Sequence, residues 1–327
     1  MPRIPAVATI IPQCSLSVLR QCAEKLRAGD LVAFPTETVY GIGADAENRD
    51  AVARMYRVKN RPTNHPVIIH IAELSDFNFW AQEVPDYAIT LMRDFWPGPM
   101  TLLLKRREVS GDYLTGNQDI VGLRIPAHGI ALGLLSEFKA IGGKGIAAPS
   151  ANRYGAVSPT TAQAVVQELS DYLLPSDLIL DGGSCLVGVE STIIDCSSEN
   201  PIILRPGAIS AEMIEGSTGI ILSEENENKI RVSGSDAQHY SPMAKVIVGG
   251  QSQRGEGLIA MNDVVTPEGV IRLAEPKSIE EFARMLFAAF RQADNQGIKV
   301  VRAIPPTGPG LAVAIRDRIN RAAANRQ

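Results

Sequence analysis

Hydrophobic positions in the first two thirds of the chain alternate between the spacing of a helix and that of a buried strand. Residues 15–28 gather their apolar side chains on one helical face, with Ser15 or Ser17 as the cap and Gly29 as the end. The run LVAF (31–34) then predicts a buried strand. A second helix is expected from about residue 48 to 58, followed by a strand in PVIIHI (66–71).

Five more apolar runs predict strands: MTLLLK (100–105), IVGLRI (120–125), GIAA (145–148), LILD (178–181) and STIID (191–195). Helices are expected between several of them, which indicates an α/β fold. We therefore predict a twisted open sheet, mixed rather than all parallel, with helices packed on it.

The pattern changes at about residue 210. Residues 210–243 are rich in Ser, Gly, Asn and Glu and weakly periodic, which is typical of a flexible linker. The remaining residues, 244–327, alternate short apolar runs with two helical patterns and predict a smaller doubly wound, Rossmann-like α/β domain. Its first two strands stand too close for a helix between them. The first domain is predicted to span residues 1–209.

Composition narrows the classes of protein. The chain has 327 residues, of which 45% are hydrophobic, so it can build about two ordinary cores. A net charge of −4 and an aromatic content of 5% disfavour a general nucleic-acid binder. The four cysteines form no C-x-x-C pair and indicate a reduced, cytoplasmic protein. No run approaches the roughly 18 apolar residues of a membrane helix, so no membrane contact is expected.

Most standard chemical motifs are missing. The sequence contains no P-loop, no G-x-S-x-G elbow and no metal-ligand spacing. Residues 41–46 fit a loose dinucleotide pattern, but no acidic residue follows about 20 positions later to bind a ribose. A dinucleotide site there is therefore disfavoured.

Positive charge gathers in residues 51–72, which contain no acidic residue. The arginines at positions 54 and 57 of this segment are predicted to lie on a solvent-exposed face of the helix. Lys59 and Arg61 differ, because Pro62 is expected to end the helix and leave both cations in a loop beside a buried strand. Two cations at this spacing are typical of a polyphosphate clamp.

Further polar residues stand at the ends of predicted strands. Ser150 and Asn152 follow one strand and Ser158 precedes a helix, as in the lining of an α/β crevice, although a loop of this composition also forms ordinary turns. Arg124 and Arg205 lie within apolar strands. Each must find an anion, either a structural carboxylate or the carboxylate of a ligand.

Seven motifs occur in the order seen in YrdC-type threonylcarbamoyl-AMP synthases, which the chain resembles: FPTETVYGIGADA, KNRPTNHPVIIHI, WPGPMTLLLK, VGLRIPAH, APSANRYGAVSPT, GGSCLVGVESTIID and ILRPG. The K-x-R and S-x-N pairs resemble the signature of that family. HYSP (239–242) and GPGLAVAIRDRINRA (308–322) resemble its long form with an extra C-terminal domain. The resemblance implies a YrdC-like mixed sheet for the first domain.

The resemblance also implies a nucleotidyltransferase reaction. L-Threonine, bicarbonate and ATP would give threonylcarbamoyl-AMP and pyrophosphate, for N6-threonylcarbamoylation of adenosine 37 in tRNA. The product would pass to the tRNA threonylcarbamoyl transferase complex, with a weak contact to tRNA left open. Mg²⁺ is expected with the nucleotide and without a dedicated protein site, because Asp45, Asp181 and Asp195 are better explained as turn or cap residues.

Roles follow from matched positions. The residues implied to bind ATP are Lys59, Arg61, His65, Ser150, Asn152, Ser158, Arg205 and Tyr240, the last closing over the nucleotide from the linker. Lys59 and Arg61 are the residues implied to be catalytic, and His65 stands where relatives often carry Asn. The residues implied to bind threonine are Thr38, His70, Arg124, the backbone of Ala148, and Ser191, with Arg124 on the carboxylate.

Two other functions stay open at this point. An RNA-binding or ribosome-associated module could use the same cationic cavity for a phosphate backbone. A carbamoyl transferase acting on another amine is the second alternative, because related domains occur in hydrogenase-maturation enzymes. Those enzymes carry acylphosphatase and zinc-finger segments that this sequence lacks.

Overall fold

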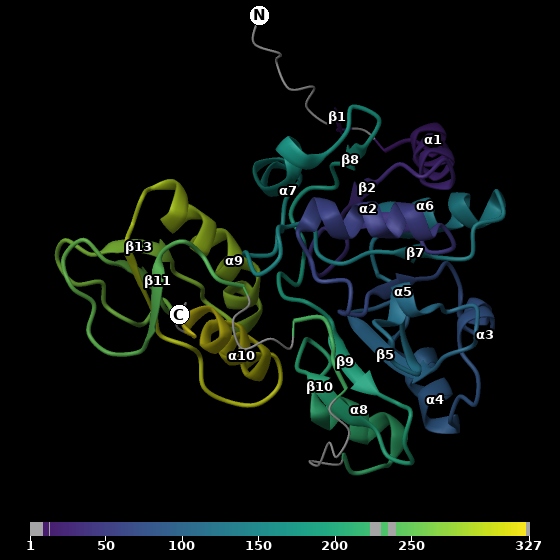
Figure 1. Ribbon diagram of the computed structural model, residues 1–327. Helices are drawn as coiled ribbons and strands as arrows, with labels where there is room; N and C mark the ends of the chain where they lie inside the picture. The colour runs from purple at the N-terminus through teal and green to yellow at the C-terminus, as the bar shows by residue number, and fades with distance from the viewer. Residues whose placement is uncertain (1–8, 13, 223–229, 235–239, 325–327) are drawn as a thin grey trace, which may run out of the picture.

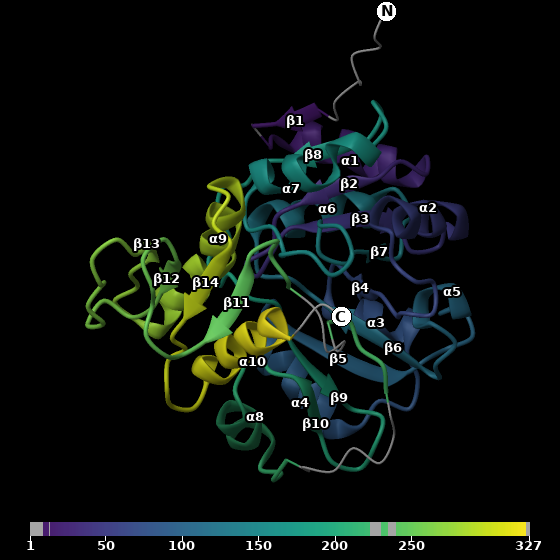
Figure 2. The same cartoon turned by 60° about the vertical axis from the view of Figure 1, so that its left-hand side comes forward.

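The computed structural model describes residues 9–12, 14–222, 230–234 and 240–324. Within them, ten strands form one large sheet, which runs from β1 at the top of Figures 1 and 2 to β10 at the bottom. The strands are β1 (Thr9–Ile11), β2 (Val32–Phe34), β3 (Gly41–Asp45), β4 (Ile68–His70), β5 (Met100–Lys105), β6 (Ile120–Arg124), β7 (Ile146–Ala147), β8 (Leu178–Leu180), β9 (Thr192–Asp195) and β10 (Ile202–Arg205).

The large sheet is mixed, as predicted. Its strand order is β1-β8-β2-β3-β7-β4-β6-β5-β9-β10. It contains parallel pairs, such as β4 with β6 and β5 with β9, and antiparallel pairs, such as β2 with β3 and β5 with β6. All seven strands expected in this part of the chain are present. β1 and β3 were not expected, because β1 is three residues long and β3 is rich in glycine.

Helices cover both faces of this sheet. They are α1 (Leu16–Arg27), α2 (Arg49–Lys59), α3 (Phe77–Trp80), α4 (Asp86–Phe95), α5 (Asp112–Thr115), α6 (Gly129–Ala140), α7 (Ala162–Leu169) and α8 (Ala211–Thr218), with short 3₁₀ helices at Leu74–Asp76 and Ser170–Tyr172. Ser15 caps α1 through a hydrogen bond from the Val18 amide, as predicted. No helix in the described part of the chain is long and apolar enough to cross a membrane.

Alternation along β2 divides the core between the two faces. Val32 and Phe34 pack with α1 and α6, whereas Ala33 belongs to the larger cluster formed with α2, α4 and α7. All three side chains are fully buried. A strand buried on both sides reads as a continuous apolar run, which explains why the sequence predicted it correctly.

Glycines of β3 serve packing. Gly43 lies so close to β7 and β2 that an added Cβ would be 2.7 Å from Ile146 and 3.0 Å from Phe34. The segment is a strand antiparallel to β2, without the strand-to-helix turn of a dinucleotide fingerprint. Residues 41–46 therefore do not have the geometry of a dinucleotide-binding turn.

The segment predicted as a linker begins with a helix. α8 is capped by Ser210, buries Ile214 and packs against α4. A flexible chain from residue 210 is therefore a wrong prediction for residues 211–218. Residues 223–229 and 235–239, which include the first residue of HYSP, lie outside the described residues. The limits of the predicted domains stay a prediction.

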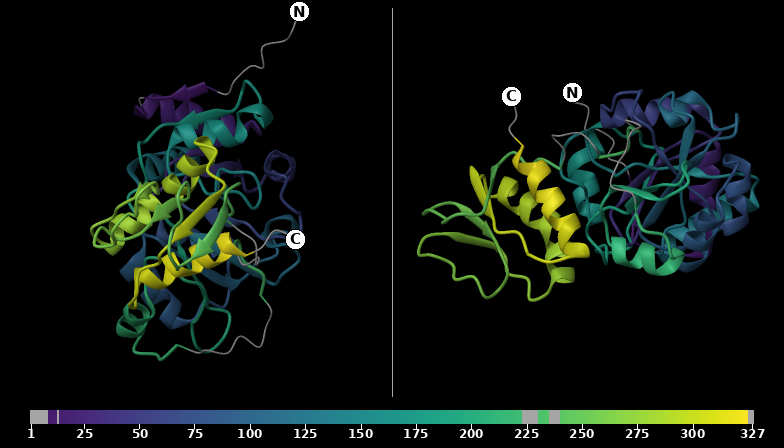
Figure 3. Two further views of the ribbon diagram at one scale, coloured as in Figure 1. Left: turned by 90° about the vertical axis from the view of Figure 1, so that its left-hand side faces the viewer. Right: turned by 90° about the horizontal axis from the view of Figure 1, so that it is seen from below.

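A second sheet of four parallel strands follows. The strands are β11 (Lys245–Val248), β12 (Gly257–Ile259), β13 (Ile271–Ala274) and β14 (Val300–Ala303), in the order β11-β14-β12-β13. α9 (Ile279–Asn295) and α10 (Leu311–Ala323) pack on each other and lie between the two sheets (Figures 1 and 3). The parallel α/β unit is confirmed, and residues 249–256 hold no helix. Both described helices cover one face, whereas a doubly wound sheet carries helices on two.

Asp177 joins three segments of the first domain and gives a test of this packing. Its side chain is fully buried, accepts from the Leu31 and Leu174 amides at 2.8 and 2.7 Å, and pairs with the Arg54 guanidinium at 2.5 Å. We expect Asp177→Ala to lower the free energy of unfolding by about 3 kcal/mol, because two amides and a guanidinium lose their partner. Urea unfolding measures this change.

The control for this prediction is Asp119→Ala, since the Asp119 side chain is fully exposed. Its free energy of unfolding should stay within about 0.5 kcal/mol of that of the unchanged protein. Equal effects of the two substitutions would contradict the structural role of Asp177.

Candidate functional site

A pocket is lined by residues at or next to the ends of β4, β6 and β7 and by the segments that precede β3 and β9. Eight of the thirteen residues expected to bind substrates line it: Thr38, His70, Arg124, Ala148, Ser150, Ser191, Arg205 and Tyr240. All five residues implied to bind threonine are among them. The pocket therefore brings together residues separated by up to 202 positions in the chain.

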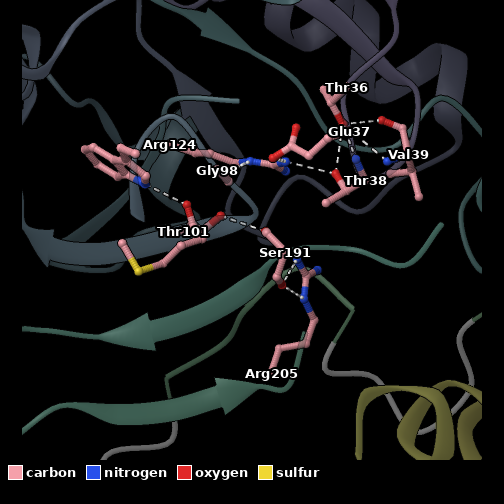
Figure 4. A network of polar contacts seen from close by, with 11 residues as sticks. Thr36, Glu37, Thr38, Val39, Gly98, Thr101, Arg124, Ser191 and Arg205 are labelled. Atoms are coloured by element: carbon pink, nitrogen blue, oxygen red, sulfur yellow. Dashed lines mark hydrogen bonds and ion pairs between the residues drawn. The ribbon is translucent and has the colours of Figure 1, made fainter. Parts of the chain in front are cut away.

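The turn between β2 and β3 presents one wall of the pocket. The Thr36 hydroxyl accepts from the amides of Thr38 and Val39, at 3.2 Å each, and donates to the Val39 carbonyl at 2.7 Å. Such a local hydroxyl turn fixes a short loop without regular secondary structure. It turns the Glu37 and Thr38 side chains toward Arg124 (Figure 4).

Arg124 is the last residue of β6 and is 4% exposed. Its Nη2 donates to Glu37 Oε1 at 2.7 Å and to the Thr38 hydroxyl at 3.0 Å, and its Nε donates to the Gly98 carbonyl at 3.2 Å (Figure 4). The sequence left open whether Arg124 pairs with a structural carboxylate or with that of a ligand; the structure shows that Glu37 is a structural partner. Within the described residues no hydrogen bond engages Arg124 Nη1, so one edge of the guanidinium is left for a ligand.

A second guanidinium is held on the opposite side. Arg205 donates from Nε and Nη2 to the Ser191 carbonyl at 3.1 and 2.9 Å, and from Nη2 to the Ser191 hydroxyl at 3.1 Å. The Thr101 hydroxyl lies 2.8 Å from the same Ser191 hydroxyl (Figure 4). These hydrogen-bond partners are neutral, so they orient the cation without forming an ion pair with it.

His70 lies beside Arg124 on the neighbouring parallel strand, β4. Burial, and then the Arg124 guanidinium, lower the pKa of His70 to about 3, so the imidazole is neutral. Its Nδ1 is buried and finds no hydrogen-bond partner among the described residues. A neutral ring with a free nitrogen offers polarity to a ligand without adding charge to the pocket.

The two cations expected in a phosphate clamp are buried. Lys59 is the last residue of α2, and its Nζ donates to the carbonyls of Ser150 and Asn152 at 2.6 and 2.5 Å. Arg61 is 6% exposed and donates to the Pro66 carbonyl at 2.8 Å. The prediction that both project from a loop is therefore wrong. In this structure Lys59 shapes the loop that presents Ser150 to the pocket.

Three more expected ATP ligands do not line the pocket. Asn152 donates from its side chain to the carbonyls of Arg153 and Ala156, at 2.8 Å each, and so holds its own turn. The Ser158 hydroxyl donates to Glu190 Oε1 at 2.6 Å. The half-buried ring of His65 stands edge-on to Tyr154, with 5.4 Å between the ring centroids.

The sequence did not predict two acidic residues, one beside the pocket and one in its lining. Glu37 stands beside Arg124, and Glu190 lines the pocket and accepts from Ser158. A signal for Glu37 existed, because an arginine inside an apolar strand requires an anion. The partner could not be chosen from the sequence, since 87 positions separate Arg124 from Glu37.

The three aspartates considered as metal ligands each interact with protein groups. Asp45 pairs with Arg27 at 2.6 Å, and Asp195 accepts from the amide and hydroxyl of Ser197 at 2.9 and 2.7 Å. Asp181 accepts from the Gly183 amide at 2.9 Å. In the described ranges, no group of three or more His, Cys, Asp or Glu residues could hold a metal ion.

Two family models match the chain. One is described as "Telomere recombination" and matches residues 24–207, and the other as "Threonylcarbamoyl-AMP synthase, C-terminal domain" and matches residues 209–324. Together they cover every strand of both sheets except β1.

Named relatives match over nearly the whole length. The threonylcarbamoyl-AMP synthase of Pyrococcus abyssi is 38% identical and covers 94% of each chain. That of Bacillus subtilis is also 38% identical, over 94% of this chain and 93% of its own. The crystal structure of P. abyssi Sua5 complexed with L-threonine superimposes with a TM-score of 0.86 at 35% identity, over 97% of this chain and 98% of that one.

The pKa of His70 predicts how stability depends on pH. The unfolded chain binds a proton at this ring below about pH 6.5, whereas the folded protein does not until about pH 3. Stability should therefore fall as the pH drops through this window. Relative to His70→Asn, the protein should lose about 2 kcal/mol of unfolding free energy between pH 8 and pH 5.

Urea unfolding of both proteins at the two pH values measures this difference. The nuclear magnetic resonance signals of the His70 ring give a second readout, because they should not titrate between pH 5 and pH 8. A midpoint near the ordinary pKa of histidine would contradict the prediction.

Proposed function

This chain belongs to the threonylcarbamoyl-AMP synthase family, and on that premise we propose how its side chains hold the substrates. The enzyme is a nucleotidyltransferase that converts L-threonine, bicarbonate and ATP into threonylcarbamoyl-AMP and pyrophosphate. Its product serves the N6-threonylcarbamoylation of adenosine 37 in tRNA. The observation that supports the assignment of residues is the shared pocket of Thr38, His70, Arg124, Ala148 and Ser191.

Threonine is proposed to bind between the β2–β3 turn and the end of β6. The free edge of Arg124 would meet its carboxylate in a charge-assisted hydrogen bond. Glu37 fixes the other edge of that guanidinium, so the cation is oriented before the ligand arrives. The hydroxyls of Thr38 and Ser191 and the Nδ1 of His70 supply the remaining polar partners.

ATP is proposed to bind on the side of Ser150, Arg205 and Tyr240, which line the same pocket. The Arg205 guanidinium carries charge toward the phosphates. Lys59 and Asn152 support this side through the loop that they hold. Ser158, His65 and Arg61 do not line the pocket, so their proposed contacts with ATP require a rearrangement. A direct phosphate contact of Lys59 requires its Nζ to leave two carbonyl groups.

The reaction depends more on the correct positioning of the substrates than on proton transfer by protein side chains. The threonine nitrogen attacks the carbon of bicarbonate, and loss of water gives a carbamate. A carbamate oxygen then attacks the α-phosphorus of ATP, and the bond to pyrophosphate breaks. Every species in this sequence is anionic, so a pocket with two oriented guanidinium groups lowers the barrier by placing and stabilising charge.

Several finer assignments belong to the proposal. Mg²⁺ is proposed to enter on the phosphates of ATP, because the described residues supply no cluster of ligands for it. Transfer of the product to the tRNA threonylcarbamoyl transferase complex, a weak contact with tRNA and a cytoplasmic location are proposed from the sequence. The alternative function, an RNA-binding module, has less support than the synthase, because the cations Lys59 and Arg61 are buried.

Mass spectrometry of a reaction mixture tests the function. Protein with ATP, bicarbonate and L-threonine should form threonylcarbamoyl-AMP and pyrophosphate, and omission of bicarbonate should abolish the adenylate. Parallel mixtures with other amino acids test the amine substrate. Equal product from several of them would overturn the assignment to threonine.

Arg124→Ala should abolish threonine use. Loss of a charge-assisted pair in a buried pocket costs about 2–5 kcal/mol of ligand affinity, which calorimetry with L-threonine measures directly. ATP affinity should change much less, because Arg205 carries the charge on that side. Arg57→Ala is the control, since Arg57 is exposed on α2 and lies outside the pocket. Unchanged threonine affinity in a folded Arg124→Ala protein would contradict the assignment.

A further inference from the structure

One motif of the chain has no part in the proposed function so far. The segment 308–322 forms most of α10, and at its centre lies Arg318, which is fully buried. A buried guanidinium is costly unless its partners are well placed, and replacing such a pair by apolar residues is often neutral or stabilising. The partners of Arg318 therefore indicate why this position holds a charge.

Arg318 reaches out of its own domain to the wall of the pocket. Its Nε donates to Glu190 Oε2 at 2.8 Å, while its Nη1 donates to the neighbouring Asp317 at 2.6 Å. Glu190 lies between β8 and β9 and lines the pocket described above. A residue of the second sheet's domain is thus bonded directly to a residue that lines the pocket.

Glu190 brings negative charge to a pocket for anions. Burial opposes its charged form, but the guanidinium groups of Arg318 and Arg205 outweigh burial and hold its pKa below the ordinary value. The carboxylate is therefore ionised, and it also accepts from Ser158 at 2.6 Å. Without Arg318 it would repel the phosphates of ATP.

Tyr240 is held by the same side chain. The Arg318 guanidinium lies over its ring at 5.1 Å, and Phe287 of α9 stacks on the ring at 5.5 Å. Tyr240 is fully buried, lines the pocket and has a φ of 61°, a left-handed conformation that is unfavourable for a bulky residue. Two helices of the second domain thus stabilise a strained residue at the pocket.

We propose that Arg318 is a positioning residue of the synthase, through which the C-terminal domain neutralises Glu190 and fixes Tyr240 on the nucleotide side of the pocket. The proposal rests on the assignment of that side to ATP. It gives the second domain a direct part in the reaction, since the pocket wall is electrostatically incomplete without α10.

Steady-state kinetics of Arg318→Ala test the proposal. We expect kcat/KM for ATP to fall on the order of 10²-fold, the loss typical of a displaced positioning group. The KM for ATP should carry most of this loss, while the affinity for L-threonine, measured by calorimetry without nucleotide, should change by less than about threefold. Arg318→Lys keeps the charge and should recover part of the ATP affinity.

Glu190→Gln provides the decisive comparison. In the Arg318→Ala background it removes the uncompensated carboxylate, so it should restore most of the ATP affinity that Arg318→Ala lost. A merely structural role of Arg318 would instead make the two losses add. Additive losses, or an unchanged ATP affinity in folded Arg318→Ala, would overturn the proposal.

Arg302→Ala is the matched control. Arg302 pairs with Glu256 at 3.0 Å in the same domain, and both side chains are 12% exposed, but neither lines the pocket. It should alter thermal stability without altering the KM for ATP. Calorimetry with ATP also separates the two proposals. If the unchanged protein made no adenylate, the proposed function would fail, while the ATP affinities would still decide the role of Arg318.

Discussion

Buried positive charge that requires partners is the constraint on which this site depends. A guanidinium removed from water costs several kcal/mol unless oxygen atoms meet it in good geometry. Glu37 meets Arg124 and Glu190 meets Arg318, and each pair joins segments that are far apart in the chain. The need to pair these charges therefore holds the β2–β3 turn, the end of β6, the segment before β9 and α10 in fixed relative positions.

The same pairing leaves charge available where a ligand needs it. Arg124 uses two of its three nitrogens on protein oxygens, and Arg205 uses carbonyl and hydroxyl groups that do not cancel its charge. His70 lies beside Arg124 as a neutral ring. A site arranged in this way presents oriented dipoles and cations to anionic substrates and needs little reorganisation when the adenylate forms.

The sequence predicts the parts of this fold that depend on local pattern. β2 and β5 were found because they are continuous apolar runs, and α1 because cap, face and end agree. β3 was not predicted, because its sequence is rich in glycine. Gly43 is required there by the close approach of Ile146 from another strand, which the local pattern does not reveal. The site follows the same division. An arginine inside an apolar strand shows from the sequence that Arg124 needs an anion. The orientation of the Lys59 side chain could not be predicted, because it depends on carbonyl groups 91 and 93 positions away in the chain.

The second domain packs against the pocket at one end of the large sheet. Glu190 and Ser191 directly precede β9, and Arg205 is the last residue of β10. These two strands form one end of the large sheet. Val39, Val157 and Val189 there pack against α9 and α10 in one continuous core. Removal of the second domain would expose this apolar surface and leave Glu190 without Arg318. The contact between the domains therefore both buries the pocket wall and neutralises its carboxylate.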